Sequence, residues 1–483
     1  MNMSKIDMTQ GSILGRAAQF ALPICIGNIL QQLYGTVDTL VIGNFCDASA
    51  LAAVATSSQP LEILLCIFLG IGSGISILIS QAAGASDADQ LRKLAQTAVF
   101  FLYAASLPLT LLGVAAGPFL LRLMQVPADA MPYAIVYLRI TTLGILGNMG
   151  YNFNAGILRG LGNSTSSLLF LGISCVTNIV LDLVLTAGLG MGVTGVAIAT
   201  TASLFLSWMF SIFYIRHTYP AMNFPVFAHG FDLPILHEML KIGLPLGLNT
   251  ALYSVGHVLL QALYNTLGST FVAGCSVAGK VSGIANIAIT SYSSAATVFA
   301  GQNLGARNYR RLCCGAWQIP LCSGIVTLAG GLLVTAFCHP LLMLFSRDPA
   351  VLAFAQRYTY LVLPFTWAYA VFNGIMCFIN GIGEIRYPTI VNILLLWVVR
   401  IPAAYLIMYA GYGEYAMVSV SASFITGMIA MLFYFKSRRW GAICALAKKQ
   451  EYPPLITDLP DSYIFTDFLN IITGVFLLSC PLR

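Results

Sequence analysis

The sequence LPICIGNILQQLYGTVDTLVIGNF, residues 22–45, is an apolar run that contains a single charged residue, Asp38. A membrane-spanning helix needs about 20 predominantly apolar residues, so this run is long enough to cross a bilayer. A carboxylate at membrane depth is costly, and it usually faces the protein interior or a water-filled cavity. The fold and the role of Asp38 therefore depend on what surrounds this run.

Stretches of the same kind occur along most of the chain. Hydrophobic residues make up 58% of its 483 residues and charged residues only 8%, against about 25% in soluble domains. Residues 1–12 are polar and the first apolar run is too long for the core of a signal peptide, so we expect it to remain as the first span. The composition predicts an all-α membrane protein. Twelve stretches reach spanning length, at residues 17–43, 51–80, 94–118, 131–158, 166–188, 192–215, 239–267, 271–300, 313–339, 353–380, 388–410 and 414–435.

Lysine and arginine are concentrated on one side of the predicted membrane. With an even number of spans both termini lie on that side, and the opposite loops contain only Arg122, Arg347 and Arg357. The positive-inside rule then places both termini in the cytoplasm and makes the chain a multi-pass protein of the cell membrane. Because the basic residues flank loops and do not form one patch, we expect no nucleic-acid partner.

The region 437–483 is predicted to be a basic cytoplasmic tail. Its stretch 463–480 is apolar, but Asp467 and Asn470 interrupt it and the Pro-rich linker EYPPLITDLP precedes it. We favour an interfacial helix or a loose tail over a thirteenth span.

The chain also contains an internal repeat, because it overlays itself when it is shifted by about 221 residues. Each half holds six apolar stretches, so both halves enter the membrane from the same side as parallel repeats. We therefore predict a first lobe at 1–215, a linker at 216–238 and a second lobe at 239–436. Proteins built in this way bind substrate between the repeats and work by alternating access. The matched pairs are Gly84 with Gly305, Tyr137 with Tyr358, Gly160 with Gly381, Gly162 with Gly383 and Gly192 with Gly413.

Two acids of the first lobe are predicted to lie at the same depth. Asp38 is near the outer end of the first span, Asp182 is near the outer end of the fifth, and Thr200 is a similar distance into the sixth. Asn178 lies one helical turn from Asp182 on the same face. Two neighbouring carboxylates resist ionising together, so such a cluster can carry a proton or bind a sodium ion through its oxygens. The alternative is a set of separate hydrogen bonds between helices.

Other ionisable residues within the spans are Glu62, Arg139, His257, Lys280 and Arg400. Glu62 either lines an outward vestibule or reaches the interface. Lys280, among small residues, is the better candidate for a cavity, whereas Arg139 and Arg400 more often have structural roles. His257 is expected to be neutral and hydrogen-bonded.

Cysteines and glycines give no sign of a cofactor. The twelve cysteines are scattered without a CxxC pair, so neither a disulfide framework nor a metal site is predicted, and no cofactor is expected besides a coupling ion. The GxGxxG pattern of residues 190–195 follows no strand, and a tight turn between two spans explains it better than a nucleotide loop.

The chain resembles the multidrug and toxic compound extrusion (MATE) transporters over roughly residues 12–440. The resemblance rests on the repeat and on several motifs. It implies efflux of organic, often cationic compounds, driven by inward flow of protons or sodium ions, with two six-helix lobes that form a V around a cleft. The motifs are LPICIGNILQQLYGTVDTLVIGNF, ALAAVATSSQP, SQAAGA, ILRGLGNS, NIVLDLVL, GVTGVAIAT, AGKVSG and GQNLGA.

The resemblance also assigns roles to individual residues. In the proton-coupled branch, the first-lobe ion site includes an Asp on the first span, matched here by Asp38. An Asn and an Asp four apart on the fifth span match Asn178 and Asp182, and a Thr on the sixth matches Thr200. Pro23 matches a proline associated with bending of the first span. Another branch uses acids in the second lobe, and no span of that lobe contains one here.

Six residues are further candidates for the lining of the cleft: Gln31, Tyr34, Glu62, Asn154, His257 and Lys280. Glu62 and the tail after residue 450 depart from the family pattern.

We therefore expect an antiporter for small organic molecules, coupled to H⁺ or Na⁺ and monomeric in the lipid bilayer. One alternative is a flippase of the same superfamily that moves lipid-linked saccharides, although few basic groups are available in the spans to bind phosphate. A membrane-embedded enzyme is less favoured, because no HExxH, paired-aspartate or Ser/Lys motif is convincing. A channel is less favoured too, because no filter-like loop repeats.

Overall fold

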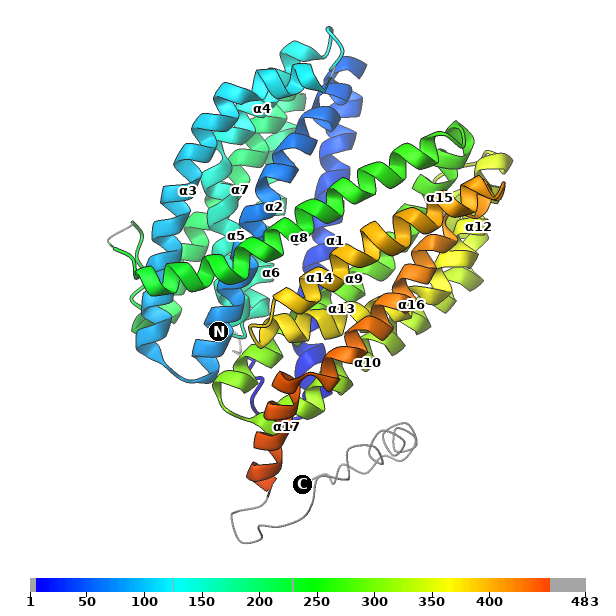
Figure 1. Ribbon diagram of the computed structural model, residues 1–483. Helices are drawn as coiled ribbons and strands as arrows, with labels where there is room; N and C mark the ends of the chain where they lie inside the picture. The colour runs from blue at the N-terminus through cyan, green and yellow to red at the C-terminus, as the bar shows by residue number, and fades with distance from the viewer. Residues whose placement is uncertain (1–5, 125, 228–229, 452–483) are drawn as a thin grey trace.

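A computed structural model describes residues 6–124, 126–227 and 230–451, and within these ranges every regular element is helical. Figure 1 shows the helices gathered into two bundles. The elements are α1 (Ile13–Phe45), α2 (Ala48–Gly84), α3 (Ala88–Leu123), α4 (Met131–Leu143), α5 (Ile145–Gly160), α6 (Ser164–Asp182), η1 (Leu183–Gly188), α7 (Val193–Thr218), η2 (Pro220–Met222), α8 (Leu233–Asn265), α9 (Ser269–Gly305), α10 (Tyr309–Ala336), α11 (Cys338–Met343), α12 (Pro349–Val362), η3 (Leu363–Phe365), α13 (Thr366–Gly381), α14 (Arg386–Leu394), η4 (Leu395–Arg400), α15 (Ile401–Tyr409), η5 (Gly413–Tyr415), α16 (Val418–Leu432), η6 (Phe433–Lys436) and α17 (Arg438–Glu451).

The twelve predicted stretches coincide with these helices. Over the described residues, nine helices are long and apolar enough to cross a membrane, and a tenth is α9, which bends by 44° between Ser269–Gly283 and Ala285–Gly305. The remaining two stretches, 131–158 and 239–267, coincide with α4–α5 and with α8. The protein is thus an all-α membrane protein with two six-span repeats.

The repeat is visible in the backbone as well as in the sequence. Asp87 caps the N-terminus of α3 by accepting from the Gln90 amide, and Asn308 caps α10 in the same way through the Arg311 amide. The residue before each cap, Ser86 or Arg307, has a positive φ, at 55° and 54°. Such side-chain caps satisfy amides that a helix start leaves unpaired. The two lobes therefore fold by the same local rules, offset by 221 residues.

The lobes pack against each other mainly through α2 with α8 and through α1 and α2 with α9. Glycines allow the closest approach, because a Cβ at Gly70 would overlap the backbone of Gly247, and one at Gly243 would overlap Ile71. Small residues are the usual means by which membrane helices come into backbone contact. From this contact the two bundles diverge toward the top of Figure 1, where α4 and α15 lie far apart.

At the opposite end, which we call the base, two hydrogen bonds join the lobes symmetrically. The side-chain amide of Gln81 donates to the carbonyl of Gly381 at 2.9 Å, and that of Gln302 donates to the carbonyl of Gly160 at 3.1 Å. Gln81 and Gln302 occupy equivalent positions in the repeat, as do Gly160 and Gly381. Each lobe therefore supplies one donor and one acceptor to the same reciprocal contact.

The segment before α1 covers this contact. The amide of Met8 donates to Gln302 Oε1 at 3.1 Å, and the amide of Ile6 donates to the Gly162 carbonyl at 3.0 Å. Arg311 holds the same segment through its Nε, which donates to the Met8 carbonyl. Residues from both lobes thus fix the N-terminal segment at the base.

The linker between α7 and α8 lies against the first lobe. Tyr103 donates to the carbonyl of Val226, the amide of Asp232 donates to Thr97 Oγ1, and Lys93 pairs with the Asp232 carboxylate at 3.8 Å. All three partners are on α3, so the linker is fixed beside the lobe that it leaves.

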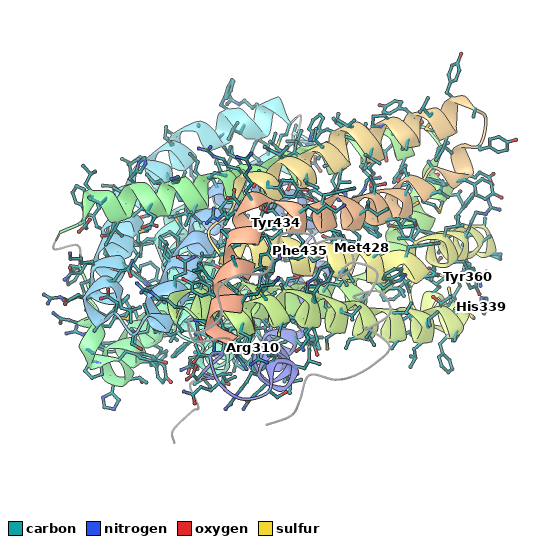
Figure 2. The ribbon with its side chains drawn as sticks, turned by 60° about the horizontal axis from the view of Figure 1, so that its bottom comes forward. Arg310, His339, Tyr360, Met428, Tyr434 and Phe435 are labelled. Atoms are coloured by element: carbon teal, nitrogen blue, oxygen red, sulfur yellow. The ribbon has the colours of Figure 1, made fainter. Side chains whose placement is uncertain are left out.

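Helix α17 packs at the base of the second lobe. Trp440 and Ile443 are buried in the same cluster as Phe20 of α1. Figure 2 shows Tyr434 and Phe435 where α16 meets α17, Arg310 near the far end of α17, and His339 and Tyr360 at the opposite end of the lobe. The predicted tail therefore begins with an ordered helix, whereas the stretch 463–480 lies outside the described residues.

The contact between α17 and α10 makes one thiol unusually acidic. Cys444 Sγ lies 3.7 Å from Cys313 Sγ. A hydrogen bond from Cys313 and the charge of Lys448 lower the pKa of Cys444 to about 7, against the opposing effect of burial. A thiol with a lowered pKa is more thiolate at neutral pH, and the thiolate is the nucleophile.

We therefore expect alkylation of Cys444 to rise through about pH 7, below the pH range of an ordinary thiol, whose pKa is about 8.5. Site-resolved mass spectrometry after brief treatment with iodoacetamide measures this profile. Cys313→Ala removes the hydrogen-bond partner and should move the profile to higher pH. An unchanged profile in that variant would contradict the assignment.

Candidate functional site

The two predicted carboxylates come together between α1 and α6. Asp38 lies in the outer half of α1 and Asp182 is the last residue of α6. Asp182 is fully buried, whereas Asp38 is partly exposed. Their side chains are in hydrogen-bond contact. Because a carboxylate only accepts hydrogen bonds, such a contact requires a proton on one of the two groups.

Asn178 connects the two acids. With its amide nitrogen turned toward them, it donates to Asp38 Oδ1 at 3.0 Å and to Asp182 Oδ2 at 3.2 Å. Asn178 is fully buried, and it lies one turn before Asp182 on the same helix face. The amide therefore fixes the distance between the carboxylates and satisfies one oxygen of each.

Thr200 and Tyr34 complete the cluster. Thr200 comes from α7, and Tyr34 lies one turn before Asp38 on α1, beside Thr200 and within electrostatic range of both acids. Asp182 Oδ1 and Thr200 Oγ1 are buried and have no hydrogen-bond partner among the described residues. Buried oxygens without a partner are uncommon and need an explanation, such as an ion, a proton or a water. Both atoms are of the kind that binds a hard cation.

The local fold explains why Asp182 is available. Helix α6 continues directly into the π-helical turn η1, whose first residue follows Asp182. A π-helical turn places one extra residue in the helix and is frequent at functional sites. Here it begins at the carboxylate that joins the cluster.

The structure places the other predicted residues elsewhere. Asn154 is buried inside the first lobe, where it donates to Ser211 Oγ at 2.8 Å, an arrangement that stabilises helix packing. His257 lies against Tyr253 with ring centroids 4.9 Å apart. Lys280 is exposed and lies 5.5 Å from the ring centroid of Phe345. None of these three takes part in the carboxylate cluster.

The remaining candidates lie on α1 and α2. Pro23 is within α1, which continues past it. Gln31 is exposed on the same helix. The side chain of Glu62 lies outside the described residues, although its backbone belongs to α2.

Analysis of the sequence did not identify the reciprocal glutamine contacts at the base. Gln81 and Gln302 are neutral and lie in otherwise apolar or small-residue segments, so a search for charges passes over them. The signal that could have found them is the repeat itself, because the motifs SQAAGA and GQNLGA place one glutamine in each half at the same offset.

Comparison with known proteins identifies the family. The family model MatE matches the chain twice, at residues 23–184 and 245–406. The chain belongs to the MATE family. Each match covers most of one lobe, so the two copies coincide with the two structural repeats.

Relatives of this MATE transporter span nearly its whole length. The probable multidrug resistance protein YpnP of Bacillus subtilis is 29% identical over 92% of this chain and 100% of its own. The probable multidrug resistance protein NorM of Thermotoga maritima is 23% identical over 89% of this chain and 94% of its own.

Solved structures share the fold. An outward-facing MATE transporter of the MOP superfamily superposes with a TM-score of 0.81 at 24% identity, over 92% of this chain and 99% of its own. A MATE protein in a straight conformation gives a TM-score of 0.83 at 22% identity, over the same shares. The arrangement of helices is therefore that of known MATE proteins.

Proposed function

We propose that this MATE transporter is a secondary active antiporter that exports organic, often cationic compounds in exchange for protons. The observation that carries the proposal is the contact of Asp38 with Asp182, both held by Asn178. Two carboxylates at this distance cannot both stay ionised without a cation between them, so the pair takes up and releases a single positive charge. The names of the relatives, which describe multidrug resistance proteins, support the class of cargo.

The orientation of Asn178 favours a proton over sodium as the coupling ion. Its nitrogen faces both carboxylates, so its oxygen points away from the place where a cation would lie between them. Sodium prefers oxygen ligands, and such a site would need the amide to turn. Thr200 Oγ1 and Asp182 Oδ1 would then be its remaining free ligands. The sodium alternative thus requires a rearrangement that the proton does not.

The transport cycle follows from the two lobes. We place the base in the cytoplasm, because basic side chains gather there, among them Arg16, Arg307 and Arg439. A proton entering from outside reaches the carboxylate pair, α1 rearranges around Pro23, and the cargo leaves between the diverging ends of the lobes. Release of the proton to the cytoplasm resets the carrier. The transporter works as a monomer in the cell membrane, because each chain contains both lobes.

Proteoliposomes containing the purified transporter and a fluorescent organic cation such as ethidium test the proposal. We expect an imposed pH gradient without sodium to drive uphill movement of the cation, and a sodium gradient at equal pH to drive none. Movement driven by sodium alone would reverse the assignment of the ion while keeping the antiporter. No gradient-driven movement, together with transport of a lipid-linked saccharide, would favour the flippase.

A further inference from the structure

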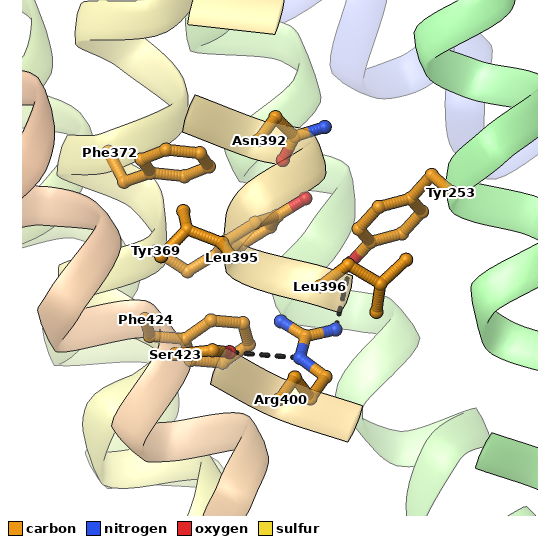
Figure 3. A pocket seen from close by; sticks show the side chains of 9 residues that line it. All are labelled: Tyr253, Tyr369, Phe372, Asn392, Leu395, Leu396, Arg400, Ser423 and Phe424. Atoms are coloured by element: carbon orange, nitrogen blue, oxygen red, sulfur yellow. Dashed lines mark hydrogen bonds between the residues drawn. The ribbon is translucent and has the colours of Figure 1, made fainter. Parts of the chain in front are cut away.

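The second lobe contains a buried positive charge with no carboxylate beside it. Arg400 ends the π-helical turn η4 and is only 6% exposed. Its Nε donates to Ser423 Oγ at 2.9 Å and one terminal nitrogen donates to the Tyr253 hydroxyl at 3.0 Å. The guanidinium also lies 5.3 Å from the ring centroid of Phe424. Figure 3 shows it between α8 and α16 with these two neutral partners.

The sequence of this lobe offers no acid to neutralise the guanidinium from within a span. Residues 239–436 contain only three acids, Asp348, Glu384 and Glu414. Asp348 caps the start of α12, Glu384 pairs with Arg439, and Glu414 pairs with Arg357. Each of these acids is thus engaged at an end of the lobe.

Such a charge is costly to keep inside the lobe. A buried charge is strongly destabilising unless a counter-charge and hydrogen bonds compensate it. A guanidinium has five N–H donors, and the two bonds above use only part of them. Contacts with aromatic faces relieve a fraction of the cost. An anion at the free donors would supply the missing compensation.

The space beside Arg400 is the right size for a small anion. The cavity has a volume of about 10 Å³, which is close to what one water-sized guest requires. Tyr369, Asn392 and Phe424 close it together with Tyr253, Arg400 and Ser423. A monatomic halide fits such a space, whereas an organic carboxylate or a phosphate group is too large.

The position of this cavity mirrors that of the carboxylate cluster. In the first lobe the charged groups come from α1 and from the end of α6, where a π-helical turn follows. In the second lobe the equivalent helix contains the π-helical turn η4, and α8 and α16 supply Tyr253 and Ser423. The repeat therefore presents two sites of opposite sign in equivalent places.

We propose that Arg400 forms an anion site that holds one chloride ion within the second lobe. Hydrogen bonds to the chloride come from the guanidinium, and the amide of Asn392 lies on the same cavity wall. This site is independent of which cation drives transport.

Equilibrium binding of ³⁶Cl⁻ to the purified full-length protein tests the proposal, with gluconate keeping the ionic strength constant. We expect saturable binding near one chloride per chain. Arg400→Gln should weaken it by about tenfold or more, since a hydrogen bond to a charged group is worth at least that factor. Lys280→Gln removes an equal charge from the same lobe outside the cavity and should leave binding intact.

Thermal unfolding of the wild-type protein provides a second measurement, in case Arg400→Gln does not fold. Chloride and bromide should raise the midpoint relative to gluconate in a concentration-dependent way, because a ligand that binds only the folded state stabilises it. Equal midpoints in chloride and gluconate, or undiminished chloride binding by folded Arg400→Gln, would overturn the site.

Discussion

Proteoliposomes that contain the Asp182→Asn variant are expected to show no proton-driven export above that of protein-free vesicles. Asparagine keeps the shape of the side chain, so the helices can pack as before, but it cannot take up the proton that the Asp38–Asp182 pair shares. Because the pair is the only place among the described spans where two carboxylates meet, no second group can replace it. Asp38→Asn should have the same effect.

Three measurements separate loss of coupling from loss of the protein. Membrane abundance and the thermal midpoint report folding, and binding of the organic cation at fixed pH reports the cargo site. We expect both variants to stay folded and to keep binding, while uphill transport disappears. Asp129→Asn is the matched control, because it removes one exposed carboxylate from the same lobe outside the cluster. If both cluster variants still exported with the wild-type dependence on pH, the proposed coupling site would be wrong.

The sequence predicted the architecture because spanning length and composition are properties of single helices. A run such as residues 22–45 crosses a bilayer whatever its neighbours are, and the offset of 221 residues predicted two equivalent lobes. Asp38, Asn178, Asp182 and Thr200 were brought together by depth alone, since topology determines how far along its span each residue lies.

What could not be predicted is the direction in which a side chain points around its helix. Asn154 is as deep and as polar as Asn178, yet it faces Ser211 inside the lobe while Asn178 faces the carboxylates. Arg400 could have reached a headgroup or a backbone carbonyl, and it lies instead between two hydroxyls. Both outcomes depend on which helices are neighbours, and one sequence does not contain that information.

The glycines at the base give the second large effect. A Cβ at Gly84 would overlap the carbonyl oxygen of Gln302, and one at Gly305 would overlap that of Gln81. The overlapped atoms are backbone, so no rotamer change can relieve the contact. We therefore expect Gly84→Val or Gly305→Val to disfavour closure of the base by about 1–3 kcal/mol each. This range corresponds to roughly a tenfold to hundredfold shift in the closed population.

Hydrogen exchange measured by mass spectrometry reports this shift. The segments 81–87 and 302–308 should exchange faster in either variant, because opening of the base exposes both sides of the contact. Export should fall in parallel, since a base that does not close cannot seal the cytoplasmic side. Gly279→Val on the same helix as Gly305 is the matched control, because no atom lies within 4 Å of its added Cβ. Faster exchange in only the mutated lobe would indicate local damage, and unchanged exchange in both would contradict closure through these glycines.

The symmetry of the contact makes the result sharper than a single mutation usually allows. Gly84 and Gly305 are equivalent in the repeat, and each meets the backbone of the glutamine that donates across the interface to Gly381 or Gly160. Combining the two substitutions should therefore add little once the base is open, because the first already separates both pairs. A double variant whose export falls by the product of the two single effects would mean that the sites act independently. Closure of the base would then not be one cooperative event.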